Sequence, residues 1–423
     1  MAIYKKTVLK NGLRIITVPQ QSTQAVTVMV LVGTGSKYEK KETNGISHFL
    51  EHMYFKGTKK RPDYLAVAET LDQVGGLYNA FTSEEFTGYY AKVEASHFEL
   101  ALDWVSDIFL NSTLPEQEFE KEKGVIGEEI NMRQDHPIEY VQVLWPKLLY
   151  GDQPAGWDIA GTKESVNSAT RTDLIEYLRS QYVASNTVIS IAGKIDESAA
   201  IQKAKKYFAE VREGKPRIKP KVIEDQKEPA ILLRERKTDQ THICLGARGF
   251  NVFHPKRYAQ ELLSVIMGEM MSSRLFIEVR EKLGLAYYIR TDAEANPDTG
   301  YFVTQAGLDN SRVEKGVTTI LKEYKKIAEI KISQTELKKA KNNLKGRMAL
   351  LLESSDAQAS LYASQELSEK NILTLKDIFA KIDKVSSSDI LGAAKDIFQP
   401  KNLNLVVLGP FSDQEKFKKL LNL

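Results

Sequence analysis

The sequence has almost no cysteine, no long apolar run and no large excess of charge of either sign. Cys244 is the single cysteine among 423 residues, which excludes a fold held by internal disulfides. No apolar run approaches the roughly 20 residues that cross a bilayer as a helix, so we expect no membrane span. The net charge of +3 is too small to indicate a nucleic-acid or membrane-surface partner. With no apolar signal core after Met1, we predict a cytoplasmic protein.

The composition that remains is that of an ordinary globular protein. Hydrophobic residues make up 42% and charged residues 27%, which excludes a disordered or collagen-like chain. At roughly 150 residues per domain, the length suggests two or three domains. Residues 211–229 contain three prolines, many charges and few large apolar residues. We therefore predict a first domain over residues 1–215, a linker over 216–229 and a second domain over 230–423.

The two halves repeat the same order of predicted elements. Each half begins with two strands, continues with two helices and a strand pair, and then has two long helices. In the first half these elements cover residues 12–18, 25–32, 45–55, 64–74, 77–93, 96–110 and 115–133. In the second half they cover residues 230–234, 241–247, 255–267, 273–283, 286–308, 311–329 and 333–352. This order is not a regular βαβ alternation, and it predicts a duplicated α+β unit.

The strongest chemical signal is the run His48-Phe49-Leu50-Glu51-His52. On a helix, residues four positions apart are stacked one turn apart, so both imidazoles can reach one metal ion. Glu51 falls on the same side, where it can accept a proton from a metal-activated water. The opposite side is an apolar stripe made of Ile46, Phe49, Leu50 and Met53. The alternative is a polar helix face that happens to contain two histidines.

A third metal ligand is expected on the helix predicted over residues 115–133. Glu122 and Glu129 are seven residues apart and share one edge of its apolar stripe, whereas Glu128 points away from that stripe. A carboxylate at a buried edge is costly unless it is paired or bound to a cation. Spacing therefore favours Glu122 and Glu129 over Glu128 and leaves open which of the two is the ligand.

These residues resemble the motif of the pitrilysin-type zinc metallopeptidases, the inverzincins. That family has H-x-x-E-H followed, about 76 residues later, by a glutamate in an acidic helix. Here 76 residues separate His52 from Glu129, and the flanking residues 45–53 and 120–130 also match. The resemblance covers almost the whole chain. It is to the short, two-domain members, similar to bacterial processing-peptidase-like proteases and to the catalytic subunit of mitochondrial processing peptidase.

The resemblance implies a fold and a set of roles. The implied fold is two homologous domains, each with a mostly antiparallel sheet packed against long helices. His48, His52 and Glu129 match the ligands of one Zn²⁺ per chain, and Glu51 matches the general base. Glu122 matches the carboxylate that orients a ligand histidine.

Two further segments match regions of the family that contact substrate. Residues 76–83 match an edge strand that pairs with an extended peptide, with Asn79, Ala80 and Phe81 as the substrate-binding residues. Without the resemblance, this segment reads as an ordinary polar edge strand after a Gly-Gly turn. In the second half, Arg280 and Tyr287 match a family pair seven residues apart. The resemblance implies that Tyr287 hydrogen-bonds the oxyanion and that Arg280 grips a substrate carbonyl.

The prediction is therefore a zinc endopeptidase that hydrolyses peptides or unfolded segments inside a closed chamber. The resemblance implies a homodimer, since one chain would supply one of two bowl-shaped halves; a heterodimer with a zinc-free paralogue is the alternative. Three other functions remain open: the catalytic half of a heterodimeric processing peptidase, a non-catalytic scaffold or complex subunit, and a metal-dependent hydrolase of non-peptide substrates.

Overall fold

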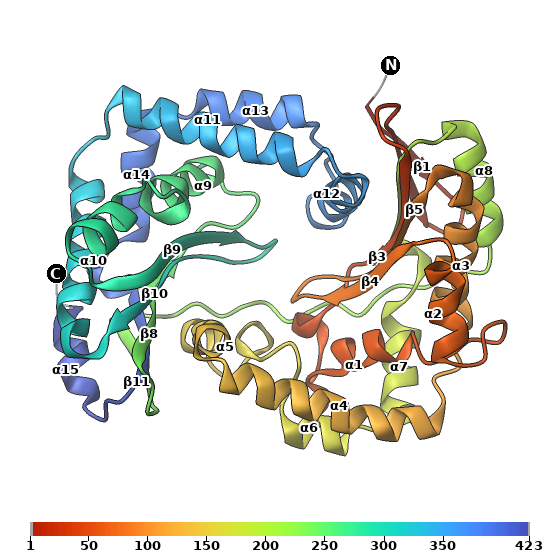
Figure 1. Ribbon diagram of the computed structural model, residues 1–423, viewed down its shortest axis with the longest axis horizontal. Helices are drawn as coiled ribbons and strands as arrows, with labels where there is room; N and C mark the ends of the chain where they lie inside the picture. The colour runs from red at the N-terminus through yellow and green to blue at the C-terminus, as the bar shows by residue number, and fades with distance from the viewer. Residues whose placement is uncertain (1–2, 422–423) are drawn as a thin grey trace. The chain divides into compact units, whose positions relative to one another are not determined.

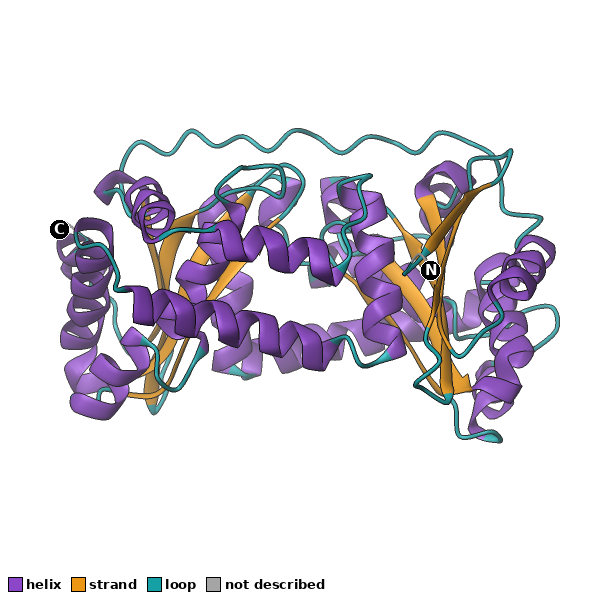
Figure 2. Ribbon diagram, turned by 90° about the horizontal axis from the view of Figure 1, so that it is seen from above, coloured by secondary structure: helices purple, strands orange, loops and turns teal. Residues whose placement is uncertain are grey.

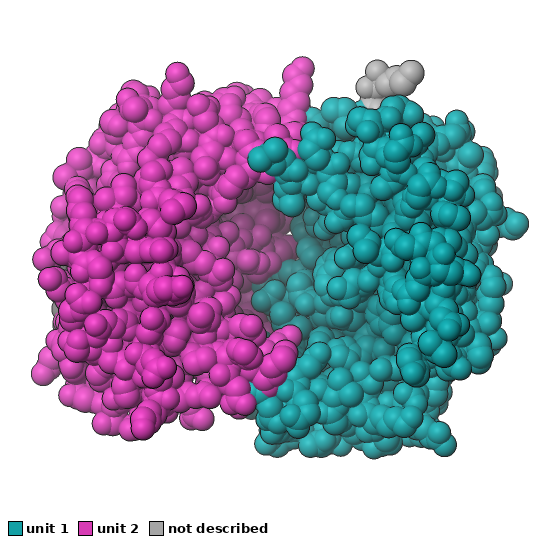
Figure 3. Space-filling model, viewed as in Figure 1, with its two compact units in different colours: residues 1–131, 157–220, 350–374 teal, residues 132–156, 221–349, 375–423 magenta. Residues whose placement is uncertain are grey.

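The strands form two separate sheets in the computed structural model, which describes residues 3–421, and each sheet belongs to one of two units (Figures 1 and 3). Unit 1 contains the residues up to 131 together with 157–220 and 350–374. Unit 2 contains 132–156, 221–349 and the residues from 375 onward. The unit boundary at residue 220 falls within the proline-rich segment 211–229, which Figure 2 shows as an extended connector without helix or strand.

The two sheets have the same strand order apart from β1, an additional edge strand in the first sheet. The sheet of unit 1 has the order β1-β2-β6-β3-β5-β4, and its strands are β1 (Lys5–Val8), β2 (Arg14–Pro19), β3 (Ala25–Val32), β4 (Leu77–Thr82), β5 (Thr87–Glu94) and β6 (Thr187–Gly193). The sheet of unit 2 has the order β7-β11-β8-β10-β9, and its strands are β7 (Ala230–Glu235), β8 (Gln240–Arg248), β9 (Ala286–Ala295), β10 (Gly300–Asp309) and β11 (Leu403–Gly409). In each sheet one pair is parallel, β2 with β6 and β7 with β11, and the other pairs are antiparallel. This repeat confirms the predicted α+β class and the mostly antiparallel, duplicated fold.

Helices cover both faces of the first sheet. The helices assigned to unit 1 are α1 (Ile46–Met53), α2 (Tyr64–Asp72), α3 (Phe98–Asn111), α6 (Lys163–Ser168), α7 (Arg171–Gln181), α8 (Glu197–Tyr207) and α12 (Ser355–Ser368), and α4 (Glu116–Asp135) lies in it up to residue 131. Alternate residues of β3 enter two different cores, with Val28 in the core that includes α1 and α3, and Met29 in the core that includes α12. This two-sided burial explains why β3 is apolar at nearly every position.

Each unit takes one helix from the other half of the chain. α12 belongs to the C-terminal half by sequence, yet it packs on β3 and β6 of the first sheet (Figure 1). α5 (Pro137–Tyr150) belongs to the N-terminal half, yet it packs on β8 and β11 of the second sheet. In unit 2, Trp145 and Val141 of α5 share a core with Cys244 and Val406. The sequence predicts two domains that are each contiguous in the chain. In the structure, each unit contains segments from both halves of the sequence.

The remaining helices complete unit 2. They are α9 (Arg257–Ser264), the π-helices η6 (Val265–Glu269) and η7 (Phe276–Lys282), α10 (Val313–Glu329), α11 (Gln334–Leu351), α13 (Leu375–Lys384), α14 (Ser387–Ile397) and α15 (Gln414–Leu420), with the last two residues of α11 assigned to unit 1. Between residues 3 and 421, every helix falls short of the length or the apolar character required to span a membrane.

Candidate metal centre

Helix α1 carries the two motif histidines, and its N-terminus is held by a buried carboxylate. Glu39 accepts hydrogen bonds from the backbone N–H groups of Gly45 (2.7 Å) and Ser47 (2.8 Å) and from the Asn44 amide (2.9 Å). The two backbone N–H groups have no partner within the helix, so Glu39 acts as the cap of α1. Burial raises the pKa of Glu39 to about 7, although the hydrogen bonds from Ser47, Gly45 and Asn44 oppose the shift. Gly45 has φ +95°, and a Cβ there would lie 2.6 Å from a backbone oxygen of Ala160.

The apolar stripe of α1 packs into the core of unit 1, and one of its rings contacts α4. Ile46, Phe49, Leu50 and Met53 are each at most 3% exposed. Phe49 stacks on Phe119 of α4 with ring centroids 4.5 Å apart and an interplanar angle of 8°. Since α4 adds one turn every 3.6 residues, this contact brings the edge with Glu122 and Glu129 beside the polar face of α1. Apolar packing therefore places the carboxylates next to the histidines.

Three ligand-type atoms converge at this junction. The Nε2 atoms of His48 and His52 are 3.2 Å apart. Glu129 Oε2 lies 3.4 Å from His48 Nε2 and 3.7 Å from His52 Nε2. Ligand atoms of the three residues lie within 4.8 Å of one another, which makes them the one such group of three or more His, Cys, Asp or Glu residues found within residues 3–421. Glu128, one residue earlier, is exposed.

The residues fit a bound metal ion. Glu129 Oε2 is buried and accepts no hydrogen bond from any residue between 3 and 421, an arrangement that is costly for a carboxylate oxygen unless a cation is its partner. Two neutral imidazoles and one carboxylate are the donor set typical of catalytic Zn²⁺, which keeps a fourth position for water. The donor chemistry and the buried oxygen both indicate a cation between the three side chains.

Glu122 orients one of the histidines. Its Oε1 lies 2.9 Å from His52 Nδ1, and its Oε2 lies 2.6 Å from the Lys56 ammonium group. The side chain is 4% exposed. Burial raises the pKa of Glu122, but the hydrogen bonds from His52 and Lys56 outweigh it, so the pKa lies below its ordinary value. A carboxylate only accepts, so it assigns the proton to Nδ1 of His52 and leaves Nε2 as the ligand atom.

Glu51 is held by a residue at the end of β4. Thr82 donates its hydroxyl to Glu51 Oε2 at 2.5 Å. Glu51 lies on the same helix as the two histidines and is partly buried. One oxygen is thereby engaged by Thr82, and the carboxylate is positioned relative to the strand.

The predicted substrate strand β4 is an edge strand. β4 pairs with β5 alone in the sheet order, and the Ser83 N–H bonds to the Phe86 carbonyl at 2.8 Å in the connecting turn. Antiparallel pairs alternate, so the backbone groups of Ala80 face the free edge and those of Phe81 face β5. The Ala80 N–H instead bonds to Asn79 Oδ1 at 2.9 Å. The Phe81 ring packs over Gly88, where an added Cβ would lie 2.5 Å from it.

Arg280 and Tyr287 belong to unit 2. Arg280 is on η7, where its guanidinium group covers the Phe276 ring at 4.7 Å. Tyr287 is the second residue of strand β9 and is 76% exposed. Of the ten side chains predicted from the sequence, eight are therefore in unit 1, and these two belong to a different unit.

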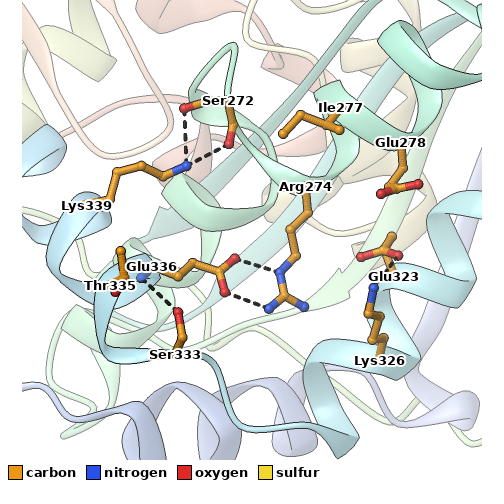
Figure 4. Close-up of a pocket in the computed structure, with 10 residues that line it drawn as sticks. All are labelled: Ser272, Arg274, Ile277, Glu278, Glu323, Lys326, Ser333, Thr335, Glu336 and Lys339. Atoms are coloured by element: carbon orange, nitrogen blue, oxygen red, sulfur yellow. Dashed lines mark hydrogen bonds and ion pairs between the residues drawn. The ribbon is translucent and has the colours of Figure 1, made fainter.

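A hollow in unit 2 is lined by charged residues that bond to one another or to the backbone. It has a volume of about 420 Å³ and lies between the start of α11 and residues 272–278 (Figure 4). Arg274 forms two bonds of 2.8 Å to the carboxylate of Glu336, and Lys339 donates to the Ser272 carbonyl at 2.9 Å. None of the ten residues labelled in Figure 4 is a predicted site residue. These paired charges join α11 to the neighbouring segment.

Three residues of the site were not predicted from the sequence. Glu39, Lys56 and Thr82 touch the motif or its partners through hydrogen bonds and ion pairs from outside the motif. Of these three, only Lys56 could have been inferred from sequence spacing, because it lies one helical turn beyond His52. The other two depend on a loop and a strand whose approach to α1 is set by the tertiary fold.

Comparisons with known proteins agree on one family. A family model described as insulinase, peptidase family M16, matches residues 14–163, and one described as the peptidase M16 inactive domain matches residues 168–344. The Bacillus subtilis protein named uncharacterized zinc protease YmxG is 36% identical over 398 residues, which are 93% of this chain and 95% of that protein.

Solved structures have the same fold over nearly the whole chain. A protease from Helicobacter pylori superposes with a TM-score of 0.89 at 26% identity, over 96% of this chain and 99% of its own. A chain of complex III2 from Candida albicans superposes with a TM-score of 0.85 at 21% identity, over 99% of both chains. At that identity the second likeness concerns the fold alone.

Proposed function

The chain belongs to the insulinase family of peptidases, family M16, and we propose that it is a zinc-dependent endopeptidase acting on peptides and unfolded segments. The observation that carries the proposal is the convergence of His48, His52 and Glu129 within 4.8 Å, beside Glu51 on the same helix. The names of relatives such as the Bacillus subtilis zinc protease support the choice of metal.

His48 Nε2, His52 Nε2 and a Glu129 oxygen would hold the ion. When bound, zinc supplies a Lewis acid that polarises the scissile carbonyl and makes a neighbouring water more acidic. The contribution of the chain is to hold three ligand atoms in place, with Glu122 fixing the ring of His52.

Glu51 is the proposed general base. It takes a proton from the attacking water, and the same proton then passes to the amine that leaves when the peptide bond breaks. Thr82 supports this role because its hydroxyl donates to one oxygen of the Glu51 carboxylate and so fixes the position of that carboxylate. The base is thereby aligned with the end of strand β4.

Strand β4 is the proposed docking site for the peptide backbone. Its free edge presents the N–H and C=O groups of Ala80, and an extended peptide adding there would form a further antiparallel or parallel strand. The bond from the Ala80 N–H to Asn79 Oδ1 would then be exchanged for one to the peptide. Backbone pairing of this kind requires an extended substrate, which is why we propose peptides and unfolded segments.

The enzyme is proposed to work as a homodimer, in which Arg280 and Tyr287 of one subunit serve substrate bound at the metal centre of the other. The 76% exposure of Tyr287 supports a role toward another molecule. Sedimentation coupled to an activity assay tests this part: we expect activity only in the dimer fraction. A monomer fraction with full activity per chain would refute it.

The test of the function is hydrolysis of an unstructured, quenched-fluorescent peptide by the wild-type chain and by Glu51→Gln at equal zinc content. We expect the substitution to lower kcat about 10²–10⁴-fold, the range typical of a lost general base. Glu128→Gln is the matched control, because it makes the same chemical change at an exposed carboxylate on α4, and it should leave the rate unchanged.

Two outcomes would contradict the proposal. Equal rates for wild type and Glu51→Gln would remove Glu51 from the chemistry. A zinc-loaded wild-type dimer that cleaves no peptide would favour a non-catalytic complex subunit, the alternative that the shared fold with a complex III2 chain supports.

A further inference from the structure

Lys56 lies one turn beyond the end of α1 and contacts the carboxylate that orients His52. Its backbone N–H bonds to the Met53 carbonyl at 3.2 Å, so the chain continues the helical turn to this position. Its ammonium group lies 2.6 Å from Glu122 Oε2, while Glu122 Oε1 lies 2.9 Å from His52 Nδ1. The two oxygens of Glu122 therefore have different partners, one toward the metal ligand and one toward Lys56.

This division of the two oxygens fixes the carboxylate at two points. A carboxylate held by one bond can rotate about its last side-chain torsion, which is broad. With Oε2 held by Lys56, Oε1 is kept in line with the Nδ1–H of His52. The His52 ring then has its Nε2 directed to the point where His48 Nε2 lies 3.2 Å away and Glu129 Oε2 lies 3.7 Å away.

The ion pair also balances the charge of a buried carboxylate. Glu122 is 4% exposed and Lys56 is 22% exposed. Removal of one partner of such a pair leaves an uncompensated charge in a poorly hydrated place. Lys56 itself lines a hollow of about 480 Å³ with Pro62, Tyr64 and Leu65.

We propose that Lys56 is a positioning residue of the metal centre, which holds Glu122 so that Glu122 holds the ring of His52 in its ligand orientation. The proposal rests on the zinc site of the proposed function and extends it by one residue. Lys56 touches neither the metal-ligand atoms nor the substrate strand in this arrangement. Substitution of Lys56 is therefore expected to lower the affinity for the metal, and to lower the catalytic rate only as a result of that loss.

The test compares Lys56→Met with Lys56→Arg and with a matched control, Lys92→Met. Lys56→Met keeps most of the side-chain volume and removes the charge, whereas Lys56→Arg keeps the charge. Lys92 is 25% exposed and lies 2.6 Å from Asp356, so it matches Lys56 in its own exposure and in the length of its ion pair, although Asp356 is 38% exposed and Glu122 is 4% exposed. Lys92 joins β5 to α12 through Ser354 and Asp356, so Lys92→Met removes a lysine ion pair of unit 1 that has no contact with Glu122 or the ligand histidines.

Zinc affinity, measured by competition with a chelating dye in the absence of peptide, is the deciding readout. We expect Lys56→Met to raise the dissociation constant for Zn²⁺ about tenfold, the lower end of the range typical of groups that orient metal ligands. Lys56→Arg should stay within about threefold of wild type, and Lys92→Met within twofold. The absorption spectrum of the Co²⁺-substituted protein should change in Lys56→Met and stay unchanged in Lys92→Met.

Wild-type affinity in Lys56→Met, or an equal loss in Lys92→Met, would overturn the proposal. Thermal unfolding of each metal-free variant shows whether the chain is folded, and Lys56→Arg provides the second variant if Lys56→Met is not. An inactive wild-type chain would overturn the endopeptidase proposal, yet the affinity difference between Lys56→Met and Lys92→Met would still support the role of Lys56.

Discussion

The buried cap of α1 makes the stability of unit 1 depend on pH in a way that can be calculated. Burial raises the pKa of Glu39 from its ordinary 4.5 to about 7 in the folded protein. A carboxyl group whose pKa is higher in the folded state binds its proton more tightly there. Its contribution to stability is therefore fully present below about pH 4.5 and is lost as the pH rises through about 7.

The size of the stability change follows from the difference between the two pKa values of Glu39. Each pH unit between them changes the free energy of unfolding by about 1.4 kcal/mol. Between pH 5 and pH 8 the loss amounts to about 2–3 kcal/mol. For a unit of about 200 residues this corresponds to a fall in Tm of roughly 4–12 °C, at about 2–4 °C per kcal/mol.

The variant Glu39→Gln isolates this contribution because glutamine does not ionise. Urea unfolding of the metal-free protein, followed through the buried Trp104 of unit 1, would be measured at pH 5, 6, 7 and 8. The variant loses a hydrogen-bond acceptor and should be less stable than wild type at pH 5. The difference between the two should then shrink by about 2–3 kcal/mol toward pH 8, because only wild type loses stability by ionisation.

Glu42→Gln is the control, since it makes the same chemical change at a nearby exposed side chain. A stability difference between wild type and Glu39→Gln that stays constant within about 0.5 kcal/mol from pH 5 to pH 8 would refute the reasoning, because a raised pKa in the folded state requires a slope. A slope of the opposite sign would refute it as well.

Three further predictions concern packing and the base. Phe49→Ala removes a stacked core ring and should lower the free energy of unfolding of unit 1 by about 3–5 kcal/mol in chemical denaturation, and a loss under 1 kcal/mol would contradict the packing described. Gly35→Ala places a Cβ 2.0 Å from the Ser83 carbonyl oxygen and should lower the free energy of unfolding by about 1–3 kcal/mol. An unchanged Tm would contradict this prediction, because it would show that the backbone at Ser83 moves away without cost. Thr82→Val removes the hydrogen bond to Glu51 and should lower kcat roughly tenfold with little change in KM. Thr82→Ser keeps a hydroxyl and should have the kcat of wild type. Equal kcat values for Thr82→Val and Thr82→Ser would show that this hydrogen bond does not contribute to catalysis.

Much of the secondary structure was predictable because the hydrophobic period differs between helices and strands. The predicted helix over residues 45–55 is α1 (Ile46–Met53), and the one over 115–133 is α4 (Glu116–Asp135). The predicted strand region 77–93 contains the hairpin of β4 and β5. Local periodicity is decided within a few turns, so it survives the tertiary environment at these places.

The exchange of α5 and α12 between the units was not predictable in the same way. Both helices have an apolar side, but periodicity shows only that a side is buried and never against which sheet. α12 packs on β3, which is more than 300 residues earlier in the chain. The partner of each helix is a property of long-range packing.

The candidate site was likewise predictable in part from local spacing and in part only from long-range packing. His48, Glu51 and His52 lie on one short helix, so their common face follows from sequence spacing and the geometry of the α-helix alone. Spacing also placed Glu122 and Glu129 on one edge of α4, but it left them equivalent. The structure separates them, because Glu129 Oε2 approaches both Nε2 atoms while Glu122 lies at His52 Nδ1.

The sequence by itself determined the ligand types, their helical phase and the repeated order of elements, since each depends on residues within a few turns of one another. The tertiary structure decided which carboxylate faces the histidines, which lysine and threonine hold Glu122 and Glu51, and which carboxylate caps α1. Those contacts join elements that are distant in sequence, such as α1 and α4, which also meet through the stacking of Phe49 on Phe119.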